Sequence, residues 1–250
     1  MLDITQLISF EISTECNLSE RHKNICPIGK RKKISDKVLT DEIIIKSIFD
    51  AYNNGFTGFI AFHFYNEPMM NSLRMFSLMD NIRMEVPRCR FLLWTNGTIL
   101  IQDPHLLMFE RTYISNYFKL PFEILDKFFN NIMINDGGEE PMDSRLKNEK
   151  CELNYNSCGF AIHDFAINNS GDVHLCCYDW ENEIKIGNIF DLNIVELSKK
   201  KWEIIKNLWW GMNDNSPKRC LTCINRHDLC KFEDNIYRKT LERNYERRSN

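Results

Sequence analysis

Six of the ten cysteines in this 250-residue chain lie between Cys158 and Cys230, and their spacing constrains the fold more than any other feature. The six are Cys158, the adjacent pair Cys176 and Cys177, and, about forty residues later, Cys220, Cys223 and Cys230. Four thiolates from two separated segments can surround one metal centre. This region therefore predicts a metal or cluster site.

The segment from Cys158 to Cys176 predicts a β-hairpin. Apolar residues alternate on both sides of the sequence Asn-Asn-Ser-Gly at 168–171, which is a typical hairpin turn. A hairpin returns its two ends to the same edge, so we expect Cys158 and Cys176 to approach each other. Cys220 and Cys223 form a Cys-x-x-Cys pair, whose tight turn lets both sulfurs bind one metal. The spacing leaves both an iron–sulfur cluster and tetrahedral zinc open.

The lack of a recognisable signal sequence or membrane span predicts that these thiols lie in a reducing compartment. The N-terminus lacks a basic start and an apolar core, and no stretch approaches the length of a membrane span. We therefore expect a cytoplasmic protein with no membrane partner, in which such cysteine pairs favour metal over disulfides. The net charge of −3 gives no reason to expect a nucleic-acid partner.

Strand and helix patterns alternate before the cysteine-rich region. We expect strands at 7–13, 58–64 and 90–94, helices at 41–53, 71–83, 104–110 and 122–130, and weaker strands near 113 and at 132–134. Thr40 is the expected N-cap of the first helix, and Gly55 is its expected stop. The order strand, helix, strand predicts an α/β fold with parallel βα units, in an open sheet or a barrel.

A polar motif follows each of the three strong strands. Cys16 follows the first strand, Asn66-Glu67-Pro68 follows the second, and Thr95-Asn96-Gly97 follows the third. Ligands bind at the C-terminal ends of strands in such sheets and barrels. We therefore expect the three motifs to line one face.

Together with Cys26-Pro27 and the later cysteine pattern, these motifs resemble the radical S-adenosylmethionine (SAM) superfamily, and within it the subgroup with a SPASM or twitch extension. In length, in the strand-two motif and in the spacing of the auxiliary cysteines, the chain is similar to 2-deoxy-scyllo-inosamine dehydrogenases. The resemblance covers about residues 7 to 230. It implies a partial parallel (β/α) barrel over 1–150, a small iron–sulfur domain over 151–233, and a basic helical tail over 234–250.

The resemblance also implies two [4Fe–4S] clusters and SAM. In this superfamily one cluster chelates SAM, and its reduction yields a 5′-deoxyadenosyl radical that abstracts hydrogen from the substrate. Asn66 and Glu67 match the motif that holds the methionine amino group, while Thr95 and Asn96 match a second SAM contact region. Arg145 precedes the extension where related enzymes approach their substrate, so it is a candidate substrate contact.

The first cysteine motif departs from the Cys-x3-Cys-x2-Cys of the superfamily. Cys16 and Cys26 match the outer cysteines, but the middle one is missing, and His22 is the nearest residue that can bind iron. Three interpretations follow. Cys16, His22 and Cys26 bind an unusual cluster; or the cluster has two protein ligands and is labile or absent; or Cys89 or Cys151 supplies the third thiolate.

For the auxiliary cluster the resemblance implies a complete set of four ligands, Cys158, Cys176, Cys220 and Cys223. Complete ligation implies a role in electron transfer or structural support. Cys177 is expected on the opposite side of a strand from Cys176, which makes it the weaker ligand. Cys230 is a further candidate metal ligand.

These expectations describe a radical SAM oxidoreductase that acts on a small polar substrate, such as a cyclitol or sugar alcohol that is oxidised to a ketone. The auxiliary cluster would accept the second electron that leaves the substrate. A reducing partner such as flavodoxin or ferredoxin would supply the electron that cleaves SAM. Two alternatives stay open. One is a radical SAM maturase that modifies a ribosomal peptide, and the other is a non-catalytic metal-binding protein that retains only the C-terminal cluster or a zinc site.

Overall fold

The computed structural model describes residues 2–23, 26–29, 38–135, 159–210, 217 and 220, without the side chains of residues 159 and 207–210. Several predicted site residues lie outside this part of the chain: Arg145, Cys151, Cys158, Cys223 and Cys230. The predicted domain boundary near residue 150 and the predicted tail at 234–250 lie outside it as well.

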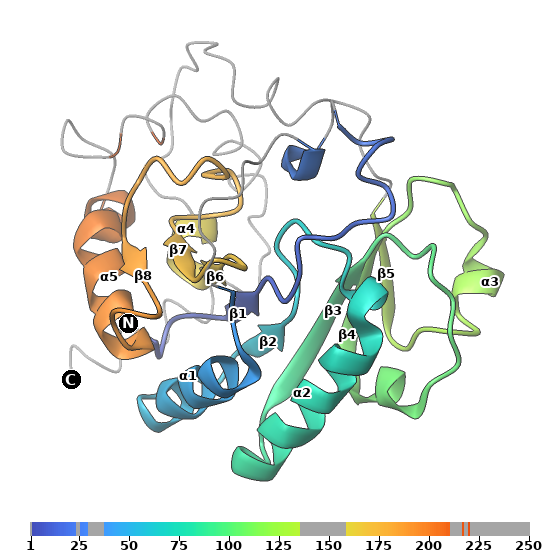
Figure 1. The fold of residues 1–250 in the computed structure, drawn as a ribbon, viewed down its shortest axis with the longest axis horizontal. Coiled ribbons are helices and arrows are strands. Elements are labelled where there is room, and N and C mark those ends of the chain that lie inside the picture. The colour runs from blue at the N-terminus through green and yellow to red at the C-terminus, as the bar shows by residue number, and fades with distance from the viewer. Residues whose placement is uncertain are drawn as a thin grey trace.

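The described residues form an eight-stranded sheet in the order β5-β4-β3-β2-β1-β6-β7-β8 (Figure 1). The strands are β1 (Leu7–Phe10), β2 (Phe59–Ala61), β3 (Arg90–Thr95), β4 (Phe109–Ser115), β5 (Ile132–Asn135), β6 (Asp164–Ile167), β7 (Asp172–His174) and β8 (Gly187–Asn188). The helices are α1 (Asp41–Asn53), α2 (Ser72–Glu85), α3 (Phe122–Leu125), α4 (Gly159–His163) and α5 (Ile194–Trp210). Three short 3₁₀ helices are η1 (Pro27–Gly29), η2 (Pro68–Asn71) and η3 (Pro104–Met108).

Parallel pairing joins β5 through β6, and β1 lies between β2 and β6. Leu7 faces Phe59 on one side and Asp164 on the other. β7 and β8 then add antiparallel strands at the β6 edge. Among the described strands, β5 and β8 form the two outer edges and do not pair with each other, so the sheet is an open, partial barrel. This confirms the predicted fold class. The hairpin predicted between Cys158 and Cys176 is present as β6 and β7, but residues 159–163 at its start form α4.

Local sequence signals set the first helix, as predicted. The hydroxyl of Thr40 accepts a hydrogen bond from Ile43 N at 3.4 Å, and α1 ends at Asn53, just before Gly55. The strands at 7–10, 59–61 and 90–95 fall within or close to the predicted ranges.

Two predicted helices are wrong in part. The expected helix at 104–110 is the 3₁₀ helix η3, and Phe109 and Glu110 belong to β4, because this segment pairs with β3. The expected helix at 122–130 has only one α-helical turn, α3, and the chain then turns through Asn131, whose φ is 48°. Pairing with β3 decided residues 109–110, and local periodicity does not report such pairing.

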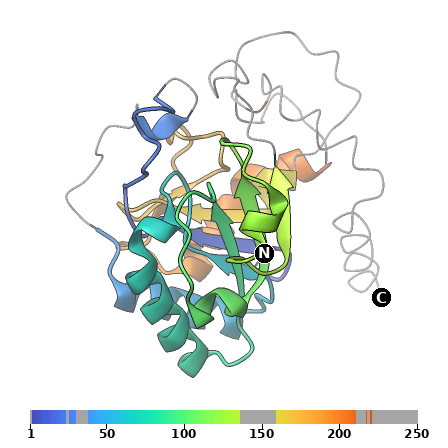
Figure 2. The same cartoon turned by 90° about the vertical axis from the view of Figure 1, so that its right-hand side faces the viewer.

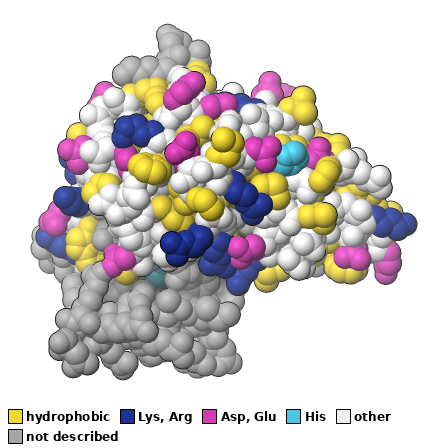
Figure 3. All heavy atoms as spheres, turned by 90° about the horizontal axis from the view of Figure 1, so that it is seen from below, with side chains coloured by type: hydrophobic (Ala, Val, Ile, Leu, Met, Phe, Trp, Pro, Cys, Tyr) yellow, Lys and Arg dark blue, Asp and Glu magenta, His cyan; other side chains and the backbone are white. Residues whose placement is uncertain are grey.

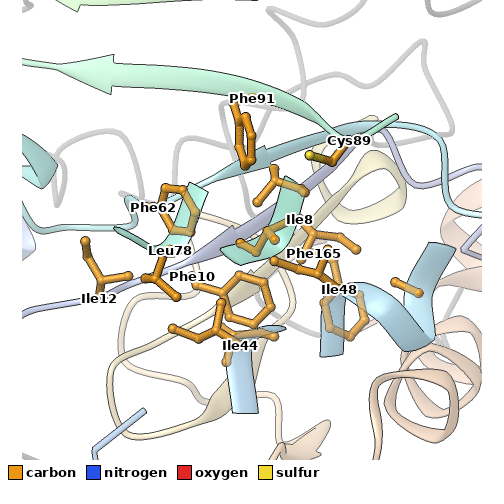
Figure 4. Close-up of a cluster of buried hydrophobic side chains, with 14 of the residues drawn as sticks. Ile8, Phe10, Ile12, Ile44, Ile48, Phe62, Leu78, Cys89, Phe91 and Phe165 are labelled. Carbon is orange, nitrogen blue, oxygen red and sulfur yellow. The ribbon is translucent and has the colours of Figure 1, made fainter. Parts of the chain in front are cut away.

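The main hydrophobic core lies between the sheet and the helices α1 and α2 (Figure 2). Ile8, Phe10 and Phe165 from the sheet meet Ile44 and Ile48 from α1 (Figure 4). The rings of Phe62 and Phe91 stack in the same core, with centroids 6.1 Å apart. The helices therefore cover this face of the sheet.

The opposite face of the sheet is concave and carries a different set of side chains. Trp94 lies between Leu93 and Thr95 on β3, and its side chain is 37% exposed while both neighbours are buried. Its ring stacks on Tyr113 of β4, with centroids 4.9 Å apart and planes 18° from parallel. His63, just beyond β2, contacts the same Trp94 ring at 5.7 Å. These three aromatic rings lie away from the helix-packed core.

Strands β6 to β8 come from the predicted second domain, yet they continue the sheet of the first. The division into two domains stays a prediction. Figure 3 shows the molecule from below relative to Figure 1, and basic and acidic side chains are interspersed over the described part of the face that it draws. None of the described helices combines the length and the apolar character that crossing a bilayer requires.

Candidate functional site

The three polar motifs meet at the C-terminal ends of β1, β2 and β3, as predicted. Glu67 N donates to the carbonyl of Glu15, the residue before Cys16, at 2.8 Å. Asn96 Nδ2 donates to Asn17 Oδ1, the residue after Cys16, at 2.8 Å. The cysteine loop is therefore bonded to both of the other motifs.

Glu67 is the buried centre of this junction, with a side chain only 3% exposed. Its carboxylate accepts hydrogen bonds from Thr95 Oγ1 at 2.7 Å, Asn96 N at 2.7 Å and Met69 N at 3.0 Å. Burial raises the pKa of Glu67, and these donors oppose the rise by stabilising the charged form. The three described donors occupy three of the about four acceptor positions of a carboxylate.

The turn after β3 depends on Gly97. Its φ is 71°, and a Cβ there would lie 2.6 Å from Ile114 Cγ2. Gly97 N donates to Thr95 Oγ1 at 3.1 Å, which fixes the hydroxyl that in turn donates to Glu67. Thr98 extends this network, because its hydroxyl donates to Asn96 Oδ1 at 2.6 Å and accepts from Asn17 Nδ2 at 2.7 Å. Thr98 was not predicted, although it directly follows the Thr95-Asn96-Gly97 motif.

Asn66 uses both ends of its amide within its own turn. Its Oδ1 accepts from Phe64 N at 3.0 Å, and its Nδ2 donates to the Phe62 carbonyl at 3.1 Å. These bonds shape the segment that delivers Glu67. A direct contact of Asn66 with SAM stays a prediction.

Cys16 lies half-buried beside this junction. Burial raises the pKa of its thiol, the charge of Glu67 raises it further, and the bond from Leu18 N opposes both. A protein thiol with a raised pKa stays protonated at neutral pH until a metal displaces the proton.

His22 is buried, and its ring contacts Tyr117, with ring centroids 4.2 Å apart. Burial lowers the pKa of His22, and neighbouring Arg21 lowers it further. The imidazole is therefore neutral near pH 7, which is the form that binds metal. Cys26 N donates to the His22 carbonyl at 2.7 Å.

Cys16, His22 and Cys26 all lie in the segment between β1 and α1. Within the described ranges, however, no three His, Cys, Asp or Glu side chains are grouped closely enough to hold a metal ion. Ligation by His22 therefore stays a prediction. Cys89 lies in the hydrophobic core just before the N-terminal end of β3, whereas Cys16 lies beyond the C-terminal end of the parallel strand β1. This placement argues against Cys89 as the third thiolate.

Two predicted auxiliary ligands are described, and both belong to the same hydrophobic cluster. Cys176 is buried within this cluster, and Cys220 packs against it. Cys176 and Cys177 follow β7, which ends at His174, so the expectation that they lie on opposite sides of a strand is wrong. The hydroxyl of Tyr65 donates to the Cys177 carbonyl. This bond joins the segment that carries Glu67 to the segment that carries the auxiliary cysteine.

The loop after Cys176 offers one observation that fits a cluster. Its backbone turns are bonded, since Asp179 N donates to the Cys176 carbonyl at 3.1 Å and Asn182 N donates to the Asp179 carbonyl at 2.9 Å. Trp180 Nε1 is buried and has no hydrogen-bond partner among the described atoms. The sulfurs of an iron–sulfur cluster accept hydrogen bonds of this kind.

Glu11 is the main residue of this region that sequence reasoning missed. It follows β1, is fully buried, and accepts from Tyr65 N at 3.2 Å and Asn169 N at 2.9 Å. The carboxylate thereby joins the Glu67 segment to the turn between β6 and β7. A charged residue inside the apolar run 7–13 was the available signal.

Comparison with known proteins agrees with this geometry. Residues 158–224 match the SPASM family, an iron–sulfur cluster-binding domain. No curated protein sequence matches the chain. The crystal structure of BtrN in complex with AdoMet and 2-DOIA is similar, with a TM-score of 0.63 and 19% identity over 88% of this chain and 92% of BtrN. BtrN in an open conformation gives a TM-score of 0.62 at 20% identity over the same shares. A structure of anSMEcpe with bound AdoMet gives 0.48 at 16% identity, over 88% of this chain and 84% of that one.

The predicted resemblance is thereby confirmed for the SPASM segment and for the fold, which is a partial barrel similar to that of BtrN. The SPASM match agrees with the predicted auxiliary cluster and covers all four of its predicted ligands. The roles of the individual residues stay predictions.

Proposed function

We propose that this chain is a radical SAM oxidoreductase that uses two [4Fe–4S] clusters and SAM to oxidise a small polar alcohol. When bound, these groups supply a 5′-deoxyadenosyl radical that abstracts a hydrogen atom from the substrate. The chain's own residues bind and orient the reactants. Cys16, Cys26 and His22 would hold the first cluster, and Cys158, Cys176, Cys220 and Cys223 the second.

The bonded junction of the Cys16 loop, Glu67 and Asn96 carries this proposal. It joins the residues on both sides of Cys16 by hydrogen bonds to Glu67 and Asn96, and no described donor occupies the fourth acceptor position of the buried Glu67 carboxylate. An ammonium group of SAM is a suitable donor for that position. The Tyr65 bond to the Cys177 carbonyl places the auxiliary segment beside the same junction, as transfer of a second electron requires.

The substrate class rests on BtrN, whose structure holds 2-DOIA. This amino cyclitol is therefore the first compound to test, with myo-inositol and glucosamine as related polyols. A peptide substrate would be indicated if none of the polyols stimulates SAM cleavage but a peptide does.

A second candidate, a non-catalytic protein that retains only the auxiliary cluster, is favoured by one observation. The His22 ring packs against Tyr117, and among the described residues it forms no metal-binding group with Cys16 and Cys26. On this reading the first cluster does not assemble, and the fold carries no radical chemistry.

Iron and sulfide content after anaerobic reconstitution separates the two candidates. We expect about eight irons per chain in the native protein and about four in His22→Ala. Lys23→Ala, at the exposed neighbouring position, is the matched control and should keep about eight. Addition of dithionite and SAM should yield 5′-deoxyadenosine from the native protein and from Lys23→Ala. About four irons in all three proteins, with no 5′-deoxyadenosine, would overturn the proposed activity.

A further inference from the structure

His63 lies on the concave face of the sheet, opposite the core. Its neighbour Phe62 is buried in the core against Phe91, whereas the His63 ring contacts Trp94 at 5.7 Å. Trp94 in turn stacks on Tyr113. The hydroxyl of Ser9 donates to the His63 carbonyl, which holds the backbone of β2's end against β1. The ring is thereby fixed on a face that the described helices do not cover.

The imidazole of His63 has a buried nitrogen with an unmet hydrogen-bonding capacity. Nδ1 is shielded from solvent and bonds to none of the described residues. Two neighbouring polar groups are already engaged, since Ser9 donates to the His63 carbonyl and Trp94 Nε1 donates to Ser115 Oγ at 3.0 Å. Burial lowers the pKa of His63 to about 4, so the ring is neutral near pH 7. A buried polar atom of this kind costs free energy unless a ligand or water satisfies it.

The position of His63 relative to the cofactor junction is set by two chain segments. One segment carries His63 and, four residues later, Glu67; the other carries Trp94 and then Thr95 and Asn96. Glu67 bonds to Thr95 and Asn96, and His63 contacts Trp94. His63 and Trp94 therefore lie next to the bonded residues Glu67, Thr95 and Asn96, on the side toward the middle of the sheet. A small molecule on the concave face beside the junction would meet His63.

We propose that His63 is a catalytic residue whose Nδ1 accepts a hydrogen bond from the reacting hydroxyl group of a cyclic polyol and then takes its proton, with Trp94 and Tyr113 packing against the ring. This inference rests on the proposed function and assigns the group that completes the oxidation. The carbinol C–H hydrogen atom passes to the 5′-deoxyadenosyl radical. The O–H proton passes to Nδ1, the remaining unpaired electron passes to the auxiliary iron–sulfur cluster, and the C–O bond becomes a carbonyl.

A weakly basic imidazole suffices for this step. As the electron leaves, the oxygen becomes that of a protonated carbonyl, which is a far stronger acid than the starting alcohol. Proton transfer to a positioned neutral nitrogen is then downhill, and such general-base assistance is worth roughly 10²- to 10⁴-fold in rate. A neutral acceptor also leaves the hydroxyl hydrogen bond intact before the reaction begins.

Replacements of different shape test which nitrogen acts. In His63→Asn the amide group occupies the position of Nδ1, in His63→Gln it reaches the position of Nε2, and in His63→Leu no acceptor remains. His105→Asn is the control for loss of a histidine, because His105 stacks on Phe76 of α2, on the helix-covered side. Each reconstituted holoenzyme is reduced with SAM and with 2-DOIA, myo-inositol or glucosamine deuterated at its carbinol carbons. Ketone, 5′-deoxyadenosine and its deuterium content are measured.

We expect about one ketone per 5′-deoxyadenosine in the native enzyme, in His105→Asn and, within a few-fold, in His63→Asn. In His63→Leu and His63→Gln deuterium should still enter 5′-deoxyadenosine, but ketone per 5′-deoxyadenosine should fall at least about tenfold. An unchanged ratio in His63→Leu, or equal losses in the Asn and Gln variants, would overturn the assignment. Native enzyme that forms 5′-deoxyadenosine but no ketone from these polyols would overturn both the proposed oxidation and the inference. Failure to form 5′-deoxyadenosine would overturn the proposed function, whereas normal ketone formation in the native enzyme with an unchanged ratio in His63→Leu would overturn the inference alone.

Discussion

Single buried polar groups decide how the candidate site is held. Glu67 accepts three hydrogen bonds, from Thr95, Asn96 and Met69, and one of these comes from a side chain that Gly97 N itself fixes. The carboxylate therefore holds the end of β3 against η2 before any ligand binds. Its structural role and its proposed ligand role depend on the same two oxygens.

Glu67→Gln tests the structural role. The new amide group would place a donor against one of the N–H or O–H donors that now face the carboxylate. We expect the free energy of unfolding to fall by about 1–3 kcal/mol in the absence of cofactors, measured by urea denaturation. Glu15→Gln is the control, since Glu15 is exposed and its bond from Asn71 Nδ2 at 3.2 Å is made in solvent. Equal stability of the two variants would contradict this role of Glu67.

His63 should make the protein less stable in mild acid. Its pKa is about 4 in the folded state and about 6.5 in an unfolded chain, so the unfolded state binds more protons between these values. Stability therefore falls as the pH drops below about 6.5, and by pH 5 this histidine alone accounts for a loss of at most about 2 kcal/mol.

Urea denaturation of the native protein and His63→Phe at pH 7 and pH 5 measures this effect, because other titrating groups cancel in the difference. The stability of the variant relative to the native protein should rise by that amount on going to pH 5. A difference that does not change with pH would show that the histidine keeps its ordinary pKa.

At the scale of elements, close packing of β1 against β2 depends on a residue without a side chain. A Cβ at Gly58 would lie 2.3 Å from the Gln6 carbonyl oxygen and 2.8 Å from Gln6 Cα. The same carbonyl accepts the first bond between the two segments, from Phe59 N at 2.7 Å. The backbone of β1 cannot give way without loss of this pairing.

Gly58→Ala should therefore lower the free energy of unfolding by more than about 2 kcal/mol, which is large for the addition of one methyl group. Thermal or urea unfolding measures it. Thr57→Ala, at the exposed preceding position, should stay within about 0.5 kcal/mol of the native protein. If Gly58→Ala also stays within that margin, β1 and β2 pack less closely than described.

Across the whole molecule, two long-range contacts connect the regions that carry the candidate cofactor sites. The buried carboxylate of Glu11 joins Tyr65 N to Asn169 N, and the Tyr65 hydroxyl reaches the Cys177 carbonyl. Tyr65 is thus held at both its backbone and its side chain. These contacts and the pairing of β1 with β6 fix the segment that carries Glu67 relative to the segment that carries Cys176.

Tyr65→Phe should loosen this connection without disturbing the core. We expect a loss of about 1 kcal/mol in unfolding free energy and faster amide exchange in the segment 176–184, measured by hydrogen–deuterium exchange. Tyr113→Phe is the control, because the Tyr113 hydroxyl bonds to no residue in the described ranges. Unchanged exchange at 176–184 in Tyr65→Phe would show that this hydroxyl does not hold the loop.

Several features follow from the sequence alone because their causes are local. Thr40 and Gly55 set the ends of α1, and the turn at 168–171 sets the β6–β7 hairpin. The placement of Cys16, Glu67 and Asn96 after successive strands was also readable, since parallel strands present their C-terminal ends at one edge. The cysteine spacing predicted the domain that the SPASM match then identified.

The tertiary structure decided what depends on partners distant in the chain. Pairing with β3 turned residues 109–110 from an expected helix into strand, and pairing of β6 with β1 carried the sheet into the predicted second domain. The roles of Glu11 and Tyr65, and the bond between Thr98 and Asn17, arise from contacts with segments tens of residues away. The unpartnered nitrogen of His63 belongs to the same class, because strand alternation gives only the face of a side chain, whereas burial and hydrogen bonding depend on every segment that packs against it.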